Sequence, residues 1–320
     1  MVQALNQALA QEMERDPAIL LMGEDVGPDG GVFRVTAGLI ERFGDQRVLD
    51  TPLAESGIIG TAIGLCIGGF RPITEIQFMG FIYPAINQLF AHAARLRNRS
   101  RGRLSVPLVV RMPYGGGIRP PEHHSESYEA MLANTPGLKT VIPADPYDAK
   151  GLLISAIRDD DPVIFLEPKR LYRAFRQAVP EEPYTVPIGK GRVYRPGKDV
   201  TVIAYGSMVQ VANAAADRAA KQEISVEVID LRSIVPLDVE IFIESVRKTG
   251  RAVVVHEAPR TCGFGAEIVA QINERALLNL LAPVERVTGF DTIFPGAVLE
   301  DHYMPNPDRV LAAIKRTLEF

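Results

Sequence analysis

The chain has 320 residues, with 35 basic and 39 acidic side chains, two cysteines and no tryptophan. Its length is typical of two domains, and with 47% hydrophobic and 23% charged residues it is neither disordered nor fibrous. The net charge of −4 gives no reason to expect nucleic acid as a partner, no apolar run reaches the ~20 residues of a membrane helix, and the N-terminus carries no secretory signal. We therefore expect a cytoplasmic protein with two buried, reduced thiols.

Short β-rich stretches alternate with helical periods through the first half of the chain, a pattern typical of parallel α/β folds. After an N-terminal helical stretch, strands are expected at residues 18–22, 47–50, 73–77, 106–111, 139–142 and 163–166. Helices are expected between them at residues 35–43, 56–67, 83–98 and 146–158.

The alternation stops between residues 170 and 198, where prolines and glycines recur without a helical period. It then resumes with strands at residues 200–205, 226–230, 252–256 and 284–288 and helices at residues 209–221, 239–248, 265–280 and 307–318. We expect two α/β domains, at residues 1–175 and 199–320, joined by a linker at residues 176–198.

Loops that leave the carboxyl ends of parallel strands are where such folds bind ligands. In the first of these loops, Glu55 stands at the start of a helix, where the helix dipole favours a carboxylate. A simple capping role is the alternative. Glycines then recur along this helix at positions 57, 60, 64 and 68. Because glycine disfavours a helix interior, this bare stripe predicts close packing against a helix of a partner subunit or of this chain.

Two further loops carry residues suited to binding and proton transfer. Phe78 and Phe81 flank a glycine after a strand, which suits either stacking on a flat ring or an ordinary aromatic core. The long loop at residues 114–127 contains three consecutive glycines and the pair His123–His124, which can transfer protons near neutral pH. Glu122 or Glu126 could instead complete a metal site with these histidines.

Several ordered stretches together resemble the β subunit of the thiamin-diphosphate-dependent E1 component of 2-oxo acid dehydrogenase complexes. The resemblance covers essentially the whole chain. It is carried by residues 23–27 (GEDVG), 30–34 (GGVFR), 50–57 (DTPLAESG), 75–78 (EIQF), 124–127 (HSES), 136–139 (PGLK), 148–153 (DAKGLL), 162–172 and 230–232 (DLR).

This resemblance implies a pyrimidine-type thiamin-diphosphate-binding parallel-sheet domain followed by a transketolase C-terminal-like α/β domain. Glu55 matches the glutamate that hydrogen-bonds the pyrimidine ring nitrogen and so activates the cofactor. Phe81 matches the aromatic residue that packs on the pyrimidine. His124 matches the histidine that assists acyl transfer to lipoamide, while the division of roles between His123 and His124 stays open.

The resemblance also implies partners and ions. The G-D-G…N-N signature that anchors magnesium and the diphosphate is absent, and in two-chain E1 enzymes it lies on the α subunit. We therefore expect half an active site, completed in an α2β2 heterotetramer. A structural potassium ion is implied at positions Leu108, Ala156, Ile157, Asp159 and Asp161, mainly through main-chain carbonyls. Asp291 and Phe320 match surface that docks the subunit-binding domain of the E2 acyltransferase.

The expected reaction is oxidative decarboxylation of a 2-oxo acid with reductive acylation of the lipoyl group of E2. Residues 121–127 resemble the pyruvate-type members more than the branched-chain ones, which usually carry a glutamine after the serine. Pyruvate is thus the expected substrate, with branched-chain 2-oxo acids and acetoin as alternatives. A non-catalytic scaffold is the alternative of another class. A self-sufficient thiamin enzyme is disfavoured by the length and by the missing signature.

Overall fold

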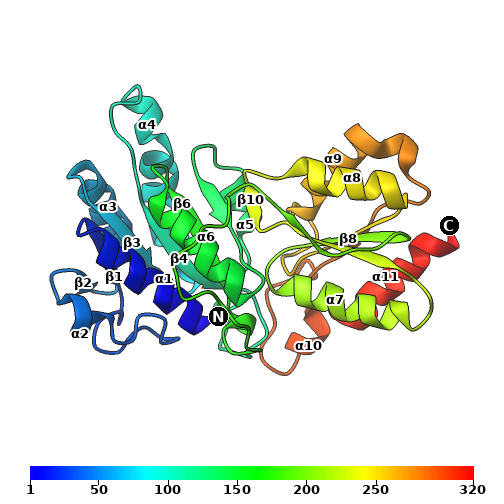
Figure 1. Cartoon of the computed structure of the whole chain (residues 1–320), viewed down its shortest axis with the longest axis horizontal. Helices are drawn as coiled ribbons and strands as arrows, with labels where there is room; N and C mark the ends of the chain where they lie inside the picture. Colours follow the sequence, from blue (N-terminus) through cyan, green and yellow to red (C-terminus); the bar gives the residue numbers. More distant parts are fainter.

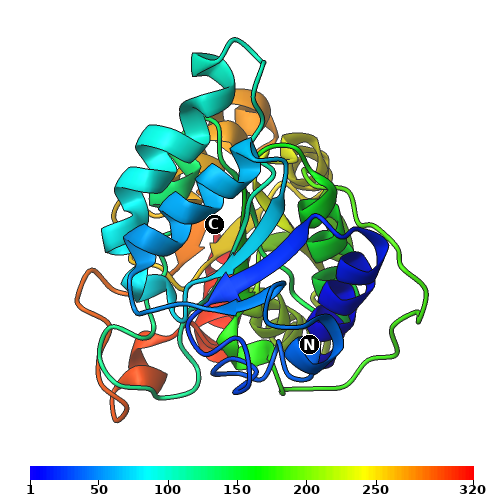
Figure 2. The same cartoon turned by 90° about the vertical axis from the view of Figure 1, so that its left-hand side faces the viewer.

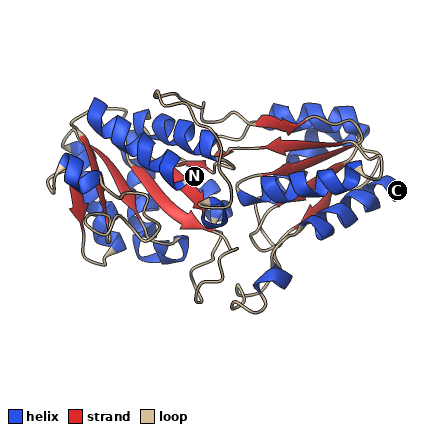
Figure 3. Ribbon diagram, turned by 60° about the horizontal axis from the view of Figure 1, so that its bottom comes forward, coloured by secondary structure: helices blue, strands red, loops and turns tan.

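Two sheets, one in each half of the molecule, organise the fold (Figures 1 and 3). The computed structural model describes residues 1–320. The strands of the first half are β1 (Ile19–Gly23), β2 (Val48–Asp50), β3 (Arg71–Glu75), β4 (Val109–Tyr114), β5 (Lys139–Val141) and β6 (Val163–Pro168). Its helices are α1 (Val2–Arg15), α2 (Leu39–Phe43), α3 (Glu55–Ile67), α4 (Leu96–Arg99), α5 (Glu129–Ala133) and α6 (Pro146–Arg158), with the short segments η1 (Met79–Ala85), η2 (Gln88–His92), η3 (Ala93–Arg95) and η4 (Lys169–Leu171).

The second half repeats the alternation. Its strands are β7 (Arg192–Arg195), β8 (Val200–Ala204), β9 (Val226–Asp230), β10 (Ser233–Val235), β11 (Ala252–Val255) and β12 (Glu285–Val287). Its helices are α7 (Ser207–Ala220), α8 (Val239–Thr249), α9 (Gly265–Ala276), α10 (Glu300–Tyr303) and α11 (Pro307–Glu319), with the short segment η5 (Leu277–Asn279). None of the helices has the length and apolar character needed to span a bilayer.

The sheets are parallel except at one edge of each. The first has the strand order β10-β5-β6-β4-β3-β1-β2, and the second has the order β12-β11-β8-β9-β7. Only β10 and β7 run antiparallel to their neighbours. Because β10 follows β9 in the chain but pairs with β5, the second half contributes a strand to the first sheet. The two halves are therefore joined by main-chain hydrogen bonds as well as by side chains.

Helices cover both faces of each sheet. The α1 and α6 helices pack on one face of the first sheet, and α3 with the segments from η1 to α4 covers the other (Figure 2). In the second sheet α7 and α11 lie opposite α8 and α9 (Figure 1). One apolar cluster runs from the α3 face of the first sheet to the α8–α9 face of the second. Strands buried on both faces explain the nearly continuous apolar runs of the sequence.

Several predicted elements differ from those observed. The helix expected at residues 83–98 is broken into η1, η2, η3 and α4, and Pro84 lies inside η1, where it lacks an N–H for a regular helix. The helix expected at residues 35–43 begins only at Leu39, after Gly38 with its positive φ of 78°. The strand expected at residues 106–111 occupies Val109–Tyr114. The prediction of two buried thiols was wrong for Cys262, which is exposed in a loop.

Four short elements were not predicted: α5, β7, β10 and α10. The strand β7 lies within the expected linker and pairs with β9 of the second sheet. Each of these elements has only three to five residues, too few for an apolar period to be recognised in a sequence. One of them, α10, carries a carboxylate that contacts the histidine loop described below.

Candidate active site

A buried ion network fixes the three strands beneath the site. Arg111 on β4 is fully buried and donates to Glu75 on β3 at 2.7 Å and to Glu167 on β6 at 2.7 and 3.0 Å. Tyr172 donates its hydroxyl proton to Glu167 at 2.5 Å. Because a guanidinium presents its donors in a rigid fork, these bonds set the relative positions of β3, β4 and β6. The loops that follow these strands therefore start from fixed points.

Glu55 is a nearly buried carboxylate that has no partner in this chain. It is the first residue of α3, directly after Ala54, and its side chain is 9% exposed. It accepts no hydrogen bond and joins no ion pair, so the capping role considered for it is wrong. Burial, and then the charge of Glu55, raises the pKa of Glu24 at the end of β1. The oxygens of Glu55 are unpaired but still reachable from outside the chain, so a donor from another molecule can approach this carboxylate.

Aromatic rings gather beside this helix. The α3 helix packs against η1, which carries Phe81, while Phe78 lies just before η1. The ring of His124 lies edge-on to both, with centroids 4.5 Å from Phe78 and 5.0 Å from Phe81. The structure thus brings Phe81 and His124 together, although they are 43 positions apart in the sequence. Phe81 is half-buried and can still offer a face to a flat ring.

Gly80 permits this approach of the two loops. A Cβ atom at Gly80 would lie 2.0 Å from the carbonyl oxygen of His123, closer than any real contact. Only glycine therefore lets the histidine loop lie against η1. On the other side of that contact His123 has a positive φ of 70°, unusual for a residue with a side chain. The ring of His123 stacks on Tyr83, at 5.8 Å between centroids and 10° between planes.

The hydrogen bonds of His124 define which nitrogen is available. Its Nδ1 lies 2.8 Å from the carbonyl oxygen of Glu122. Because a carbonyl can only accept, Nδ1 carries the proton and the lone pair of Nε2 is free in the neutral ring. The carbonyl oxygen of His124 accepts a hydrogen bond from the ammonium of Lys169. The bond to Glu122 thus orients the ring of His124, and the bond from Lys169 holds its main chain.

Lys169 is a site residue that the sequence analysis did not single out. It lies at the start of η4, directly after β6, and only 2% of it is exposed. Burial lowers its pKa to about 8, even though nearby carboxylates act in the opposite direction. A lysine immediately beyond an apolar strand was the available signal, since strand ends carry the ligand-binding loops. Its contact with His124 required the folded chain.

The glycine stripe of α3 has no close neighbour in this chain. A Cβ atom at Gly64 would meet nothing within 4 Å. A Cβ atom at Gly57 would meet only the side chain of Ala54, 3.6 Å away. At Gly60 the nearest atoms belong to the side chain of Gln88, at 3.6 Å. Within this chain only Gly60 meets another helical segment, through a side chain of η2, and no backbone packs closely on the stripe. A neighbour from a partner subunit stays a prediction.

The residues implied for potassium lie together where α6 meets the first sheet. Arg71 donates to the carbonyl oxygen of Ile157 at 3.1 and 3.0 Å and to that of Asp159 at 2.6 Å. Lys139 contacts both oxygens of the Asp159 carboxylate at 2.8 Å and approaches Asp161 at 3.2 Å.

Main-chain oxygens of these positions are also engaged with backbone donors. The carbonyl of Leu108 accepts from Val163 at 2.9 Å, and that of Ala156 accepts from Asp159 at 3.3 Å. A carbonyl oxygen has two lone pairs, so a monovalent ion could share these oxygens with the cationic side chains. These oxygens are suitable ligands for potassium, but some of their lone pairs already accept hydrogen bonds from the protein.

Asp291 and Phe320 lie at opposite ends of α9. Asp291 accepts from the backbone N–H and the hydroxyl of Thr261, which precede the helix, at 2.8 and 2.7 Å. Phe320 lines an apolar hollow of about 510 Å³ with Leu277 and Leu281, which follow the helix. A helix of 12 residues is about 18 Å long, so the two positions do not form one compact patch.

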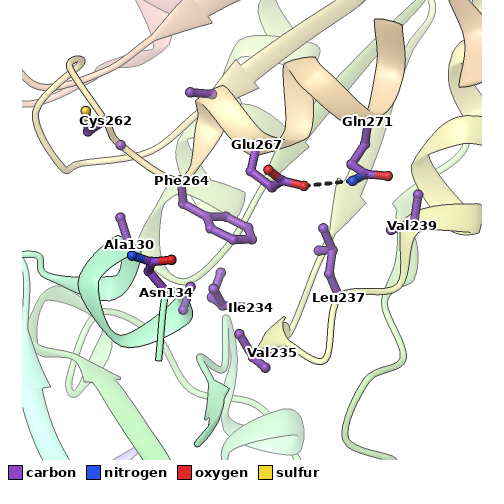
Figure 4. Close-up of a pocket in the computed structure, with 13 residues that line it drawn as sticks. Ala130, Asn134, Ile234, Val235, Leu237, Val239, Cys262, Phe264, Glu267 and Gln271 are labelled. Carbon is purple, nitrogen blue, oxygen red and sulfur yellow. Dashed lines mark hydrogen bonds between the residues drawn. The ribbon is translucent and has the colours of Figure 1, made fainter. Parts of the chain in front are cut away.

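A cavity of about 440 Å³ lies elsewhere, between α5, the β10–α8 connection and the start of α9 (Figure 4). Its walls are mostly apolar, and its one internal hydrogen bond joins Gln271 to Glu267 at 2.7 Å. None of the predicted site residues lines it. It is a hollow at the junction of the two halves, separate from Glu55 and the aromatic rings.

Comparison with known proteins agrees with this arrangement. Residues 1–174 match the family "Transketolase, pyrimidine binding domain", and residues 189–310 match "Transketolase, C-terminal domain". The pyruvate dehydrogenase E1 component subunit beta of Staphylococcus aureus is 52% identical over 320 residues, which cover 100% of this chain and 98% of that protein. The protein of the same name from Bacillus subtilis is 53% identical with the same coverage.

A solved structure described as "Split gene transketolase, inactive beta4 tetramer" has the same fold, with a TM-score of 0.80. It is 24% identical, and the match covers 99% of this chain and 97% of that one. The order of the two matched domains and this likeness confirm the predicted fold class.

Proposed function

The chain belongs to the family of pyruvate dehydrogenase E1 β subunits, and from this we propose that it supplies one half of a thiamin-diphosphate site that decarboxylates pyruvate. The observation that carries the proposal is Glu55, a nearly buried carboxylate without a partner in its own chain, on a helix packed against the segment of Phe81. A buried acceptor and an adjacent aromatic ring fit a flat, basic heterocycle.

In this proposal Glu55 accepts a hydrogen bond from the aminopyrimidine ring and holds a proton on its ring nitrogen. Phe81 packs against the face of the ring and keeps water from the carboxylate, which strengthens that bond. When bound, thiamin diphosphate supplies the electron sink for loss of carbon dioxide from the 2-oxo acid. The scaffold alternative does not explain why an unpaired buried carboxylate is maintained at this position.

We assign to His124 the proton transfers that accompany passage of the acyl group to the lipoyl group of E2. Its Nε2 is the free nitrogen because Nδ1 is bonded to the carbonyl of Glu122. When the S–S bond of the lipoyl group breaks, one sulfur leaves as a thiolate, and an imidazole that carries a proton on Nε2 can deliver that proton and later regain one, a usual role of histidine near neutral pH. His123, whose ring stacks on Tyr83, is less favourably placed to move.

The diphosphate and its magnesium ion are assigned to an α subunit in an α2β2 heterotetramer, because this chain lacks the G-D-G…N-N signature. The uncovered glycine stripe of α3 is the surface we propose for that contact. Asp291 and Phe320 are proposed contacts for the E2 acyltransferase; their positions at the two ends of α9 require a partner that spans about 18 Å. We also propose that the protein is located in the cytoplasm. Its two domains are proposed to span residues 1–175 and 199–320.

Potassium is proposed at the carbonyl oxygens near Ile157 and Asp159. The measurement is the thermal midpoint of the α/β complex in potassium chloride and in sodium chloride at equal ionic strength. A site built from carbonyl oxygens distinguishes the two ions, so a higher midpoint in potassium is expected. Equal midpoints would remove potassium from the proposal and leave Arg71, Lys139 and Arg97 as the cations there.

The decisive experiment replaces Glu55 in the α/β complex with glutamine and with alanine. Loss of a group that positions and transfers a proton is expected to reduce 2-oxo acid decarboxylation by ~100-fold or more. The matched control is Glu240→Gln, which changes an exposed first-turn carboxylate on α8. Decarboxylation near the wild-type rate in both Glu55 variants would refute the assignment.

His124→Ala tests the second half of the proposal. It is expected to reduce lipoyl acylation more than decarboxylation measured with an artificial electron acceptor. Equal losses in both assays would point instead to binding of the substrate or activation of the cofactor.

A further inference from the structure

The stem of the loop that carries His124 is bonded to carboxylates of the C-terminal domain. The backbone N–H of Gly116 donates to Glu257 at 2.8 Å, and that of Gly117 donates to Glu300 at 2.7 Å. The N–H of Arg119 also donates to Glu300, at 3.2 Å. Glu257 follows β11 and Glu300 begins α10, the short helix that Figure 1 shows below the junction of the two halves.

Both carboxylates are buried, and Glu257 has a further partner in its own domain. Glu257 is 4% exposed and also accepts a hydrogen bond from the hydroxyl of Ser207 at the start of α7. Glu300 is 2% exposed. Hydrogen bonds in which the acceptor is ionised are roughly twice as strong as neutral ones. The loop stem is therefore attached to buried carboxylates rather than to exposed surface side chains.

The glycines of the stem are required by this attachment. A Cβ atom at Gly116 would lie 2.6 Å from the ring of Phe294 and 2.8 Å from the sulfur of Met304, both in the C-terminal domain. Gly117 has a positive φ of 101°, and a Cβ there would meet Arg170 at 2.7 Å. Side chains at either position would push the stem away from the two carboxylates. A Cβ at Gly115 would likewise lie 2.5 Å from the Glu257 carboxylate, so Gly115 and Gly116 serve a close approach between the domains and Gly117 an approach within the first domain.

We propose that Glu257 and Glu300 are positioning residues for His124. They fix the stem at residues 116–119, four to seven positions before the start of the histidine pair. The base of the loop is closed by the N–H of Gly115, which donates to the carbonyl of Glu126 at 3.1 Å. With the stem fixed, the segment that follows places the ring of His124 against Phe78 and Phe81. The inference rests on the proposed role of His124.

A purely structural role, in which the two carboxylates only join the domains, makes a different prediction. The chain offers a matched control: Tyr205, directly after β8, donates to Glu129 on α5 at 2.7 Å, a buried bond between the domains that does not involve the loop stem. If Glu300 acts only by joining domains, Tyr205→Phe and Glu300→Ala should have similar effects. If it positions His124, only Glu300→Ala should affect the loop.

The experiment uses the assembled α/β complex with Glu300→Ala, Glu300→Gln or Tyr205→Phe. Hydrogen exchange is followed at the amides of Gly117 and Arg119, together with decarboxylation to an artificial acceptor and lipoyl acylation. Losing a charged acceptor should speed exchange at both amides by ~10-fold or more and reduce kcat of lipoyl acylation ~10-fold, with a smaller loss of decarboxylation. Glu300→Gln keeps a carbonyl acceptor and should restore most of both. Tyr205→Phe should leave exchange at these amides unchanged.

Three results would overturn the inference: unchanged exchange in Glu300→Ala, equal losses in the two activities, or the same pattern in Tyr205→Phe. The exchange measurement does not depend on the role of His124. If His124→Ala leaves lipoyl acylation intact while Glu300→Ala speeds exchange, the assignment of His124 fails and the anchoring of the loop stands.

Discussion

Replacing Lys169 with methionine is expected to stabilise the protein at neutral pH and to impair acyl transfer. The ammonium of Lys169 is almost completely buried and donates to the carbonyl oxygen of His124. Burial lowers its pKa from 10.5 to about 8. Below pH 8 the folded protein therefore holds a buried charge that the unfolded chain would keep in water, and this charge opposes folding.

The size of the effect follows from the two pKa values. At about 1.4 kcal/mol per pKa unit, lowering the value from 10.5 to about 8 corresponds to ~3 kcal/mol. The penalty is complete below pH 8 and disappears as the pH rises from 8 to 10.5, because the unfolded lysine then also releases its proton. Methionine removes the penalty but loses the hydrogen bond of the neutral amine, worth about 1 kcal/mol. The net gain is ~2 kcal/mol at pH 7 and becomes a loss of ~1 kcal/mol above pH 10.5.

The measurement is the free energy of unfolding in urea at pH 7 and above pH 10.5, with the α/β complex at one fixed protein concentration. Lys315→Met is the control, since Lys315 is exposed and bonds to no other group. Lys169→Met should change from stabilising to destabilising between the two pH values, and lipoyl acylation should fall because the carbonyl of His124 loses its donor. A variant that is destabilised equally at both pH values would refute the buried charge.

Two further changes give expectations of known direction. Burial raises the pKa of Glu129 to about 7, so the folded protein keeps a proton that the unfolded chain releases above its ordinary pKa of 4.5, and the stability from this group is lost as the pH rises through 7. The free energy of unfolding in urea should therefore be compared for Glu129→Gln and the wild type at pH 4 and at pH 8. The difference between the two proteins should shift in favour of Glu129→Gln by up to ~3 kcal/mol from pH 4 to pH 8. A difference that does not depend on pH would contradict this prediction. Phe81→Ala should weaken thiamin diphosphate binding to the α/β complex about fivefold, the loss of ~1 kcal/mol of ring packing, as measured by titration calorimetry. Unchanged affinity would remove Phe81 from the cofactor site.

The long, periodic elements of the fold were predictable from the sequence, and the short ones were not. Strands buried on both faces, such as β6 and β8, produce apolar runs that no other pattern in this chain imitates. The segment at residues 83–98 kept a helical period but not regular α-helical hydrogen bonds, and no local residue after Pro84 signals the irregular turns at residues 88–95. The pairing of β10 with β5 depends on where the second half of the chain lies, which three residues of local sequence do not encode.

The candidate site divides in the same way. The position of Glu55 at a helix start follows from the local sequence, and its lack of any partner does not, because that requires knowing what every other side chain contacts. Phe81 and His124 were each singled out, but their contact depends on Gly80, whose missing side chain lets the carbonyl of His123 approach. Lys169 and Glu300 were missed because each acts on a residue distant in the sequence.

The anchoring of the histidine loop by another domain is effective only if the two domains keep their relative position. Domains within a chain usually move unless their interface is extensive and apolar. Here β10 adds main-chain hydrogen bonds across the junction, and one apolar cluster continues from one sheet to the other. Arg232, which precedes β10, also donates to Asp148 on α6 at 2.9 and 2.7 Å. With the two domains joined in this way, the hydrogen bonds from the loop stem to Glu257 and Glu300 can act as an anchor for the segment that carries His124.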